Sequence, residues 1–256
     1  FHKFYTDNPK MSRKSHFLAA MVVFFGILGT ANSQLLPSFA FAGGVTAGWH
    51  FNPTKDLNLQ LKDAGFPEMS ENGFLTFGGG GFIDLPNKSN FIRIGGFGNG
   101  FSSKLTKQVN DTLTKASNYS LGQGGISLEY VIPISKIFDI SFGSQFSTGT
   151  LSLELYQYGK GSGNYGTIFG ELQSNGTSSN LSRVFKSRFY TVQPQLGIGV
   201  LLRKFMYLKI DCGYQLGAQS TWRVDNNTEV TGFPKGIEAK GLVVNVGLNF
   251  GLFIRE

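Results

Sequence analysis

The last segment of the chain alternates between apolar residues and small or polar ones. Leu242, Val244 and Val246 occupy one set of alternate positions, and Asn245 and Gly247 occupy the other. Because successive side chains of a β-strand point to opposite faces, this period of two predicts a strand with one apolar and one polar face. The pattern recurs from residue 43 onward and predicts eight strands, at about residues 43–51, 73–84, 89–101, 120–132, 137–149, 185–202, 205–222 and 239–254.

The composition agrees with a chain built of sheet. It includes 35 glycines and 25 phenylalanines, and only 15% of its residues are charged, whereas soluble globular domains carry about 25% charged residues. This composition argues against a soluble helical enzyme. The glycine runs 78–81 and 95–98 do not form a phosphate-binding loop, because no Lys-Ser/Thr pair closes either loop and no helix follows at the required place. Glycines in strands permit the tight curvature of a narrow barrel.

The connections between the predicted strands alternate in length. Short turns at 85–88, 133–136 and 203–204 follow the second, fourth and sixth strands, and long polar connections follow the others. Beyond the N-terminal leader, no run of about 20 apolar residues could form a transmembrane helix. We therefore predict an all-β, antiparallel up-and-down transmembrane β-barrel of eight strands, with its apolar face toward lipid and its short turns in the periplasm. A hairpin hidden in 159–182 would raise the strand count.

In these features the chain resembles the small bacterial outer-membrane barrels of the OmpA/OmpX type. The resemblance rests on alternation, strand count and loop asymmetry, and it covers the whole chain after the leader. It implies a location in the bacterial outer membrane, with lipopolysaccharide and the assembly machinery as partners. One feature departs from the pattern: such barrels usually end in an aromatic residue, and this chain ends Phe253-Ile254-Arg255-Glu256.

The N-terminal residues have the order of a signal peptide. A basic segment that begins at Met11 precedes an apolar run, and small residues follow up to Ser33. We expect residues 1–10 to be an upstream extension, 11–33 the signal peptide, and 34–256 a single barrel domain; cleavage after Ala42 is the alternative. Cys212 is the single cysteine, so an internal disulfide cannot form.

The charge of the chain gives little indication of a partner. Removal of the leader takes away four basic residues and one acidic residue, which lowers the net charge from +7 to +4. The remaining basic residues are scattered, and we expect no binding of nucleic acid.

Aromatic residues gather near both ends of the predicted strands, as expected for the two interfaces of a membrane. Near the long loops these are Trp49, Phe51, Tyr119, Tyr156, Tyr158, Tyr190 and Trp222, and near the short turns they are Phe91, Tyr130, Phe138, Phe205 and Tyr207.

Five charged residues fall on the polar face of the predicted strands, close to the short turns. An eight-stranded barrel is just wide enough for side chains to fill it, and an unpaired buried charge costs several kcal/mol. We therefore predict an ionic network that plugs the lumen, or alternatively a gated ion or proton path. Its members are Arg93, Glu129, Asp139, Lys209 and Asp211.

Two further sets of residues could carry chemistry. His50 is the one histidine after the leader and lies near the predicted outer rim, where some outer-membrane lipid A acyltransferases and deacylases place a catalytic histidine. No serine or carboxylate is near it in the sequence, and we interpret it as solvated or interfacial. Arg183, Lys186 and Arg188 lie at the same rim and could contact lipopolysaccharide phosphates; a simply solvated rim is the alternative.

The sequence favours a monomeric, non-enzymatic barrel without cofactor or metal. Its role would be structural, or would depend on recognition by the long loops 157–183 and 223–238. A lipid A-modifying enzyme that uses His50, a narrow passive pore or ligand carrier, and a soluble exported β-protein are the alternatives. Within the first long connection, the spacing of Leu57 and Leu61 predicts a short helix over 54–64 that rests on the barrel mouth, or else a strand extension.

Overall fold

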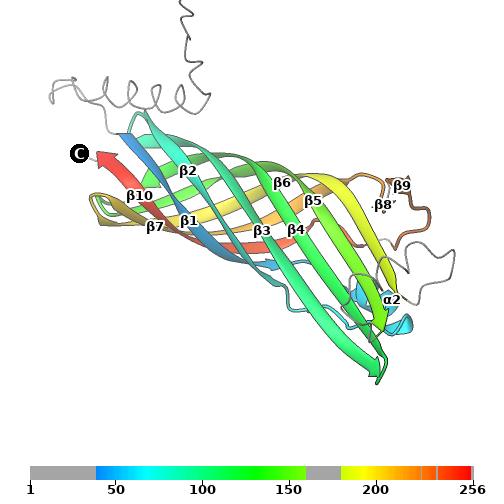
Figure 1. Ribbon diagram of the computed structural model, residues 1–256. Coiled ribbons are helices and arrows are strands. Elements are labelled where there is room, and N and C mark those ends of the chain that lie inside the picture. The colour runs from blue at the N-terminus through cyan, green and yellow to red at the C-terminus, as the bar shows by residue number, and fades with distance from the viewer. Residues whose placement is uncertain (1–38, 160–179, 226, 235, 255–256) are drawn as a thin grey trace, which may run out of the picture. The chain divides into compact units, whose positions relative to one another are not determined.

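A computed structural model describes residues 39–159, 180–225, 227–234 and 236–254 of the chain. Eight long antiparallel strands pair in the order β5-β4-β3-β2-β1-β10-β7-β6, and the β5–β6 pairing closes the ring (Figure 1). The predicted fold class and strand count are confirmed. The long strands are β1 (Phe39–Phe51), β2 (Phe74–Asn87), β3 (Asn90–Asn110), β4 (Leu113–Pro133), β5 (Phe138–Gly159), β6 (Leu181–Arg203), β7 (Met206–Gln219) and β10 (Gly241–Ile254).

The remaining elements all lie at the long-loop end of the barrel. They are the helix α2 (Lys55–Asp63) and the two-residue strands β8 (Arg223–Val224) and β9 (Thr228–Glu229), which form a small hairpin against β6. None of the described residues belongs to a helix long and apolar enough to cross a membrane. The predicted leader, residues 1–33, is outside the described residues, and a cut after Ala42 would remove the first four residues of β1.

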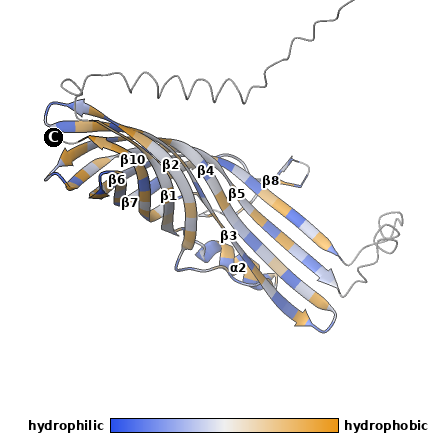
Figure 2. Ribbon diagram, turned by 60° about the vertical axis from the view of Figure 1, so that its left-hand side comes forward, coloured by the Kyte–Doolittle hydropathy of each residue, from blue (hydrophilic) through white to orange (hydrophobic). Residues whose placement is uncertain are grey.

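The alternation along each strand separates an apolar outer face from a polar lumen, and hydrophobic and hydrophilic residues follow one another along the strands (Figure 2). In β10, Leu242 and Val246 are exposed outward, while Val243 and Asn245 are buried inside. In β1 and β2 the sequence could be phased either way, and the structure places large apolar side chains outward there too. The outer-facing residues of these two strands include Phe41, Val45, Trp49, Leu75, Phe77 and Ile83.

Four neighbouring strands are much longer than the rest. β3 to β6 have 21 to 23 residues each, and β1, β2, β7 and β10 have 13 or 14. The prediction of a long polar loop after residue 101 is wrong. β3 and β4 instead continue as a paired hairpin as far as a turn at 111–112. A strand ladder that satisfies its own backbone groups can continue into water beyond the lipid. The barrel therefore carries a four-stranded extension on one side, visible in Figure 1.

The lumen is filled in layers. At the short-turn end, an apolar cluster contains Phe82, Tyr207 and Phe253. Charged side chains follow, and then glutamine and asparagine side chains. At the long-loop end a larger apolar cluster fills the mouth; its members include Phe74, Phe101, Tyr119, Leu121, Leu151, Phe189 and Trp222. We call this cluster the mouth cluster.

Helix α2 covers the mouth cluster, which confirms the helix predicted at this place. Leu57 and Leu61 are each 2% exposed and pack into the cluster. The amide of Asn58 holds the segment that follows, because its Nδ2 donates to Met69 O at 2.8 Å and its Oδ1 accepts from Met69 N at 2.7 Å. The first connection is therefore a fixed lid.

Some aromatic residues predicted at the membrane interfaces lie inside the barrel. Trp49 and Tyr190 are exposed on the outer face, as expected. The prediction is wrong for residues whose alternation places them on the inner face or whose loop folds into the mouth. These are Phe91, Tyr119, Tyr207 and Trp222, all less than 9% exposed.

We predict that Leu61→Ala destabilises the lid by about 2–4 kcal/mol, since it removes a fully buried side chain from a packed cluster. Leu59→Ala is the matched control, because Leu59 lies on the same helix and is 55% exposed; it should change stability by less than about 0.5 kcal/mol. Hydrogen exchange of α2 amides measures the effect. Equal protection of α2 in the two variants would contradict the packing described.

Candidate functional site

Arg93 on β3 is the centre of the charged layer. Its guanidinium donates to both carboxylate oxygens of Asp84 on β2, from Nε at 2.7 Å and from Nη2 at 2.9 Å. The guanidinium also lies over the ring of Phe82, 4.1 Å from its centroid, and within 3.9 Å of Glu129 Oε2. A bidentate ion pair of this kind fixes both the position and the orientation of the guanidinium. Arg93 thereby links β3 to β2 and β4.

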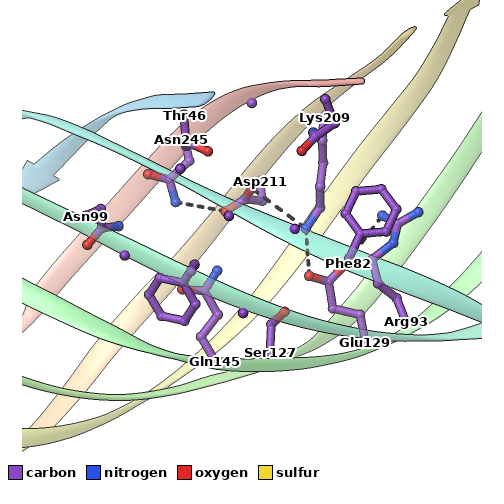
Figure 3. A pocket seen from close by; sticks show the side chains of 18 residues that line it. Thr46, Phe82, Arg93, Asn99, Ser127, Glu129, Gln145, Lys209, Asp211 and Asn245 are labelled. Atoms are coloured by element: carbon purple, nitrogen blue, oxygen red, sulfur yellow. Dashed lines mark hydrogen bonds and ion pairs between the residues drawn. The ribbon is translucent and has the colours of Figure 1, made fainter. Parts of the chain in front are cut away.

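Lys209 on β7 makes the second set of ion pairs, across the lumen. Its Nζ lies 2.7 Å from Glu129 Oε1 and 3.8 Å from Asp211 Oδ2. Glu129 also accepts from Gln195 Nε2 at 2.8 Å, and Asp211 accepts from Asn245 Nδ2 at 2.9 Å. Figure 3 shows Glu129, Lys209, Asp211 and Asn245 joined in this order. The carboxylate of Glu129 is thus shared by both cations.

Asp139 joins the network through a tyrosine. Tyr207 Oη donates to Asp139 Oδ1 at 2.7 Å and accepts from Arg93 Nη1 at 3.0 Å. Gly199 lies beside this contact, and a side chain there would overlap the Tyr207 hydroxyl. The lumen is so narrow here that glycine is required opposite the ring.

The structure brings all five predicted lumen charges into one layer, and it adds a sixth. Sequence reasoning missed Asp84, because the four glycines before it left the phase of β2 open. Asp84 pairs directly with Arg93 in the β2–β3 hairpin. Counting back equally along both strands from the turn at 88–89 would have placed the two residues side by side. This register is the signal that could have found it.

A chamber of about 80 Å³ lies next to the ion pairs. Thr46, Asn99 and Asn245 line it together with Glu129 and Lys209 (Figure 3). The side-chain oxygens of Asn99 and Asn245 are buried and have no hydrogen-bond partner among the described residues. A chamber of this volume with such acceptors suits a few water molecules.

His50 is not at a solvated rim. It is 1% exposed and points into the mouth cluster, where its ring meets the edge of Phe101 at a centroid distance of 6.0 Å. The expectation of a solvated or interfacial histidine is therefore wrong, because the phase of β1 directs this side chain inward. Among the described residues no group of three or more potential metal ligands gathers anywhere.

The three cations predicted at the outer rim are separated by the structure. Arg183 pairs with Asp225, and the backbone N–H of Val184 and this guanidinium together hold the pKa of Asp225 below its usual value. The positive charge of Arg183 is thus compensated by the carboxylate of Asp225. Lys186 and Arg188 lie on one exposed face of β6. Arg223 of the neighbouring strand β8 lies beside them, and the sequence analysis did not include this residue.

The two loops expected to carry recognition differ in how they are held. Of 157–183, residues 160–179 are outside the described residues. Within 223–238, Phe233 stacks on Trp222 at a centroid distance of 4.1 Å, and Ile237 is buried in the mouth cluster. Part of the second loop therefore packs against the mouth cluster, as the first connection does.

A closed antiparallel ring of eight long strands, with an apolar outer face and a filled polar lumen, is a transmembrane β-barrel of the kind found in bacterial outer membranes.

No protein-family model matches the chain, and no curated protein does. Among solved structures, the chain is similar to Ail, the attachment invasion locus protein of Yersinia pestis, in complex with the heparin analogue sucrose octasulfate. Identity is 9% over 85% of this chain and 99% of Ail, with a TM-score of 0.36. CarO of Acinetobacter baumannii is similar at 11% identity over 86% of this chain and all of CarO, with a TM-score of 0.32.

We predict that Arg93→Met lowers the free energy of unfolding of the barrel by about 3–5 kcal/mol, because it leaves Asp84 and Glu129 buried without their shared cation. Arg223→Met is the control, since Arg223 forms an exposed pair with Glu229 at 3.5 Å, and loss of such a pair costs about 0–1 kcal/mol. Urea titration of the detergent-folded barrel, followed by tryptophan fluorescence, measures both. Equal losses would show that the lumen network is not a main source of stability.

Proposed function

We propose that this chain resides in the bacterial outer membrane and acts as a non-enzymatic surface-interaction protein. In this proposal the barrel is an anchor, and the extension of β3 to β6 is the part that meets a partner outside the cell. The single observation that supports it best is an open strand edge on that extension.

The length of the outer apolar row supports the division into anchor and extension. On β6 the outward positions from Val200 to Tyr190 are apolar or aromatic. Ten residues at about 3.3 Å each span roughly 33 Å along the strand, and a tilt of about 40° reduces this to about 25 Å, the height of an outer-membrane apolar band. Residues 181–189 of β6, and the parts of β3 to β5 beside them, extend past this band.

The open edge is the outer part of β3. From Ser102 to Asn110 the described pairings of β3 are with β4 alone, since the pairing with β2 ends at Gly100. Nearly all of these residues are exposed. An unpaired edge presents backbone donors and acceptors to which an extended segment of another chain can add as a further strand.

The charge of this edge favours one kind of partner. It carries Lys104 and Lys107 and no acidic residue between Phe101 and Asn110; Asp111 follows in the turn. Lysines on an edge disfavour pairing with an identical edge. The edge therefore suits an extended segment with acidic side chains better than a second copy of this chain.

We predict that a labelled ten-residue peptide of alternating Glu and Val binds the detergent-folded barrel more tightly than its Lys-Val counterpart. The double variant Lys104→Glu, Lys107→Glu should weaken binding of the acidic peptide by about tenfold or more, equivalent to ~1.4 kcal/mol. The control is the double variant Lys55→Glu, Lys62→Glu, which makes the same charge change on the exposed side of α2. It should have little effect on binding of the acidic peptide. Fluorescence anisotropy measures binding, and an unchanged affinity in the first variant would rule out the edge as the site.

We further propose that the lumen does not conduct. The charged layer lines the 80 Å³ chamber and consists of buried side chains joined by ion pairs. The buried apolar side chains of the mouth cluster fill the long-loop end of the lumen. The expected result in planar bilayers is an absence of stepwise conductance at physiological salt. Large, reproducible steps would instead support the passive pore.

The lipid-modifying enzyme has little support. It requires His50 to meet a lipid substrate, and His50 is enclosed by the mouth cluster. An assay of lipid A before and after incubation with the folded barrel tests this alternative, and a modified product lost in His50→Ala would revive it.

A further inference from the structure

We propose that the outer face of β6 and β8 carries a binding site for the phosphate groups of lipids in the leaflet at the long-loop end. The site is distinct from the open edge of β3 and concerns the surrounding membrane instead of a protein partner. It therefore rests on residence in the outer membrane but not on the proposed surface interaction. The structure assigns it to a surface groove of about 760 Å³.

Three cations converge on this groove from two strands. Lys186 and Arg223 are register partners in the β6–β8 pair, so their side chains leave the sheet on the same face. Arg188 follows two residues after Lys186 and shares this face. No acidic side chain is among the described residues that line the groove, which also include Thr150, Tyr190, Ser220 and Thr221.

The two cations of β6 that line the groove have no carboxylate partner in the part of the chain that the structure describes. No ion pair joins Lys186 or Arg188 to a described residue, whereas Arg183 has Asp225. Arg223 meets Glu229 only at 3.5 Å and at the surface. Glu154, on the neighbouring strand, already accepts from Tyr156 and Asn118. The groove thus has uncompensated positive charge available to an anion.

The position of the groove along the barrel axis, at the outer limit of the apolar band, indicates which anions it can meet. Tyr190 is 68% exposed and ends the outer apolar row of β6, and Arg188 is the next outward position. Tyrosine is enriched on the outer surface of membrane barrels at the level of the lipid headgroups, where an apolar row ends. Arg188, Lys186 and Arg223 therefore begin where lipid phosphates lie.

The chemistry of the three side chains fits a phosphate group. A guanidinium binds two phosphate oxygens in a fork, and an ammonium adds a point charge. The hydroxyls of Thr150 and Thr221 line the same groove and can donate further hydrogen bonds. Bisphosphorylated lipid A, the anchor of lipopolysaccharide, carries such groups at the height required.

The test compares lipid retention by the intact folded chain in native mass spectrometry. The triple variant Lys186→Gln, Arg188→Gln, Arg223→Gln is measured beside Lys104→Gln, Lys107→Gln, Lys136→Gln, which removes the same charge from the open edge and from a short turn. Bisphosphorylated and dephosphorylated lipid A are the probes. Because all the substituted side chains are at the surface, both variants should fold, and a shift in gel mobility on boiling verifies this.

We expect the wild-type barrel and the control variant to retain bisphosphorylated lipid A at least tenfold more than the dephosphorylated form. The groove variant should lose this preference. Equal retention by the groove variant would overturn the proposal. Displacement of the lipid by millimolar inorganic phosphate would overturn it as well, because the groove would then be a site for free anions and not for a membrane lipid.

Discussion

Closure of the strand ring is the constraint on which the rest of the structure depends. In lipid, every backbone donor and acceptor must find a partner inside the protein, and an open sheet leaves two edges unpaired. Pairing of β5 with β6 removes these edges within the membrane. Eight strands then enclose a lumen with room only for side chains. The apolar outer face and the filled interior both follow from this closure.

The narrow lumen determines how its polar residues are arranged. Buried charges are tolerated only when they are paired and hydrogen-bonded, and the side chains around Arg93 and Lys209 satisfy this requirement with carboxylates, a tyrosine and two amides. Three of the contacts, Arg93 with Tyr207, Lys209 with Glu129 and Gln195 with Glu129, join strands that are not neighbours in the ring. The network thereby fixes the relative register of opposite walls, which the backbone pairing of neighbours does not do alone.

Much of the architecture could be predicted from the sequence, because alternation directly reports which residues face lipid. β7 and β10 were predicted with the correct faces. The prediction was weakest where glycine replaces side chains: the run 78–81 hid the phase of β2, and with it Asp84. The phase of β1 was open for the same kind of reason, and His50 was expected at a solvated or interfacial rim position although it is buried in the mouth of the barrel.

Other features lie beyond what alternation can report. The continuation of β3 and β4 past the membrane depends on pairing between residues with no strong hydrophobic pattern, such as Thr106 with Ala116. The outer groove depends on Arg223, which only the β6–β8 pairing brings beside Lys186.

The uneven strand lengths have a mechanical consequence. Beyond Phe101, β3 runs for nine residues, or about 30 Å, without a break between the barrel wall and the tip. A pull on the tip is directed along the strands, so it loads the hydrogen bonds of the ladder in shear and all at once, whereas a pull across the strands would open them one by one. The geometry of the extension therefore directs a load at its tip along the strands and into the barrel wall.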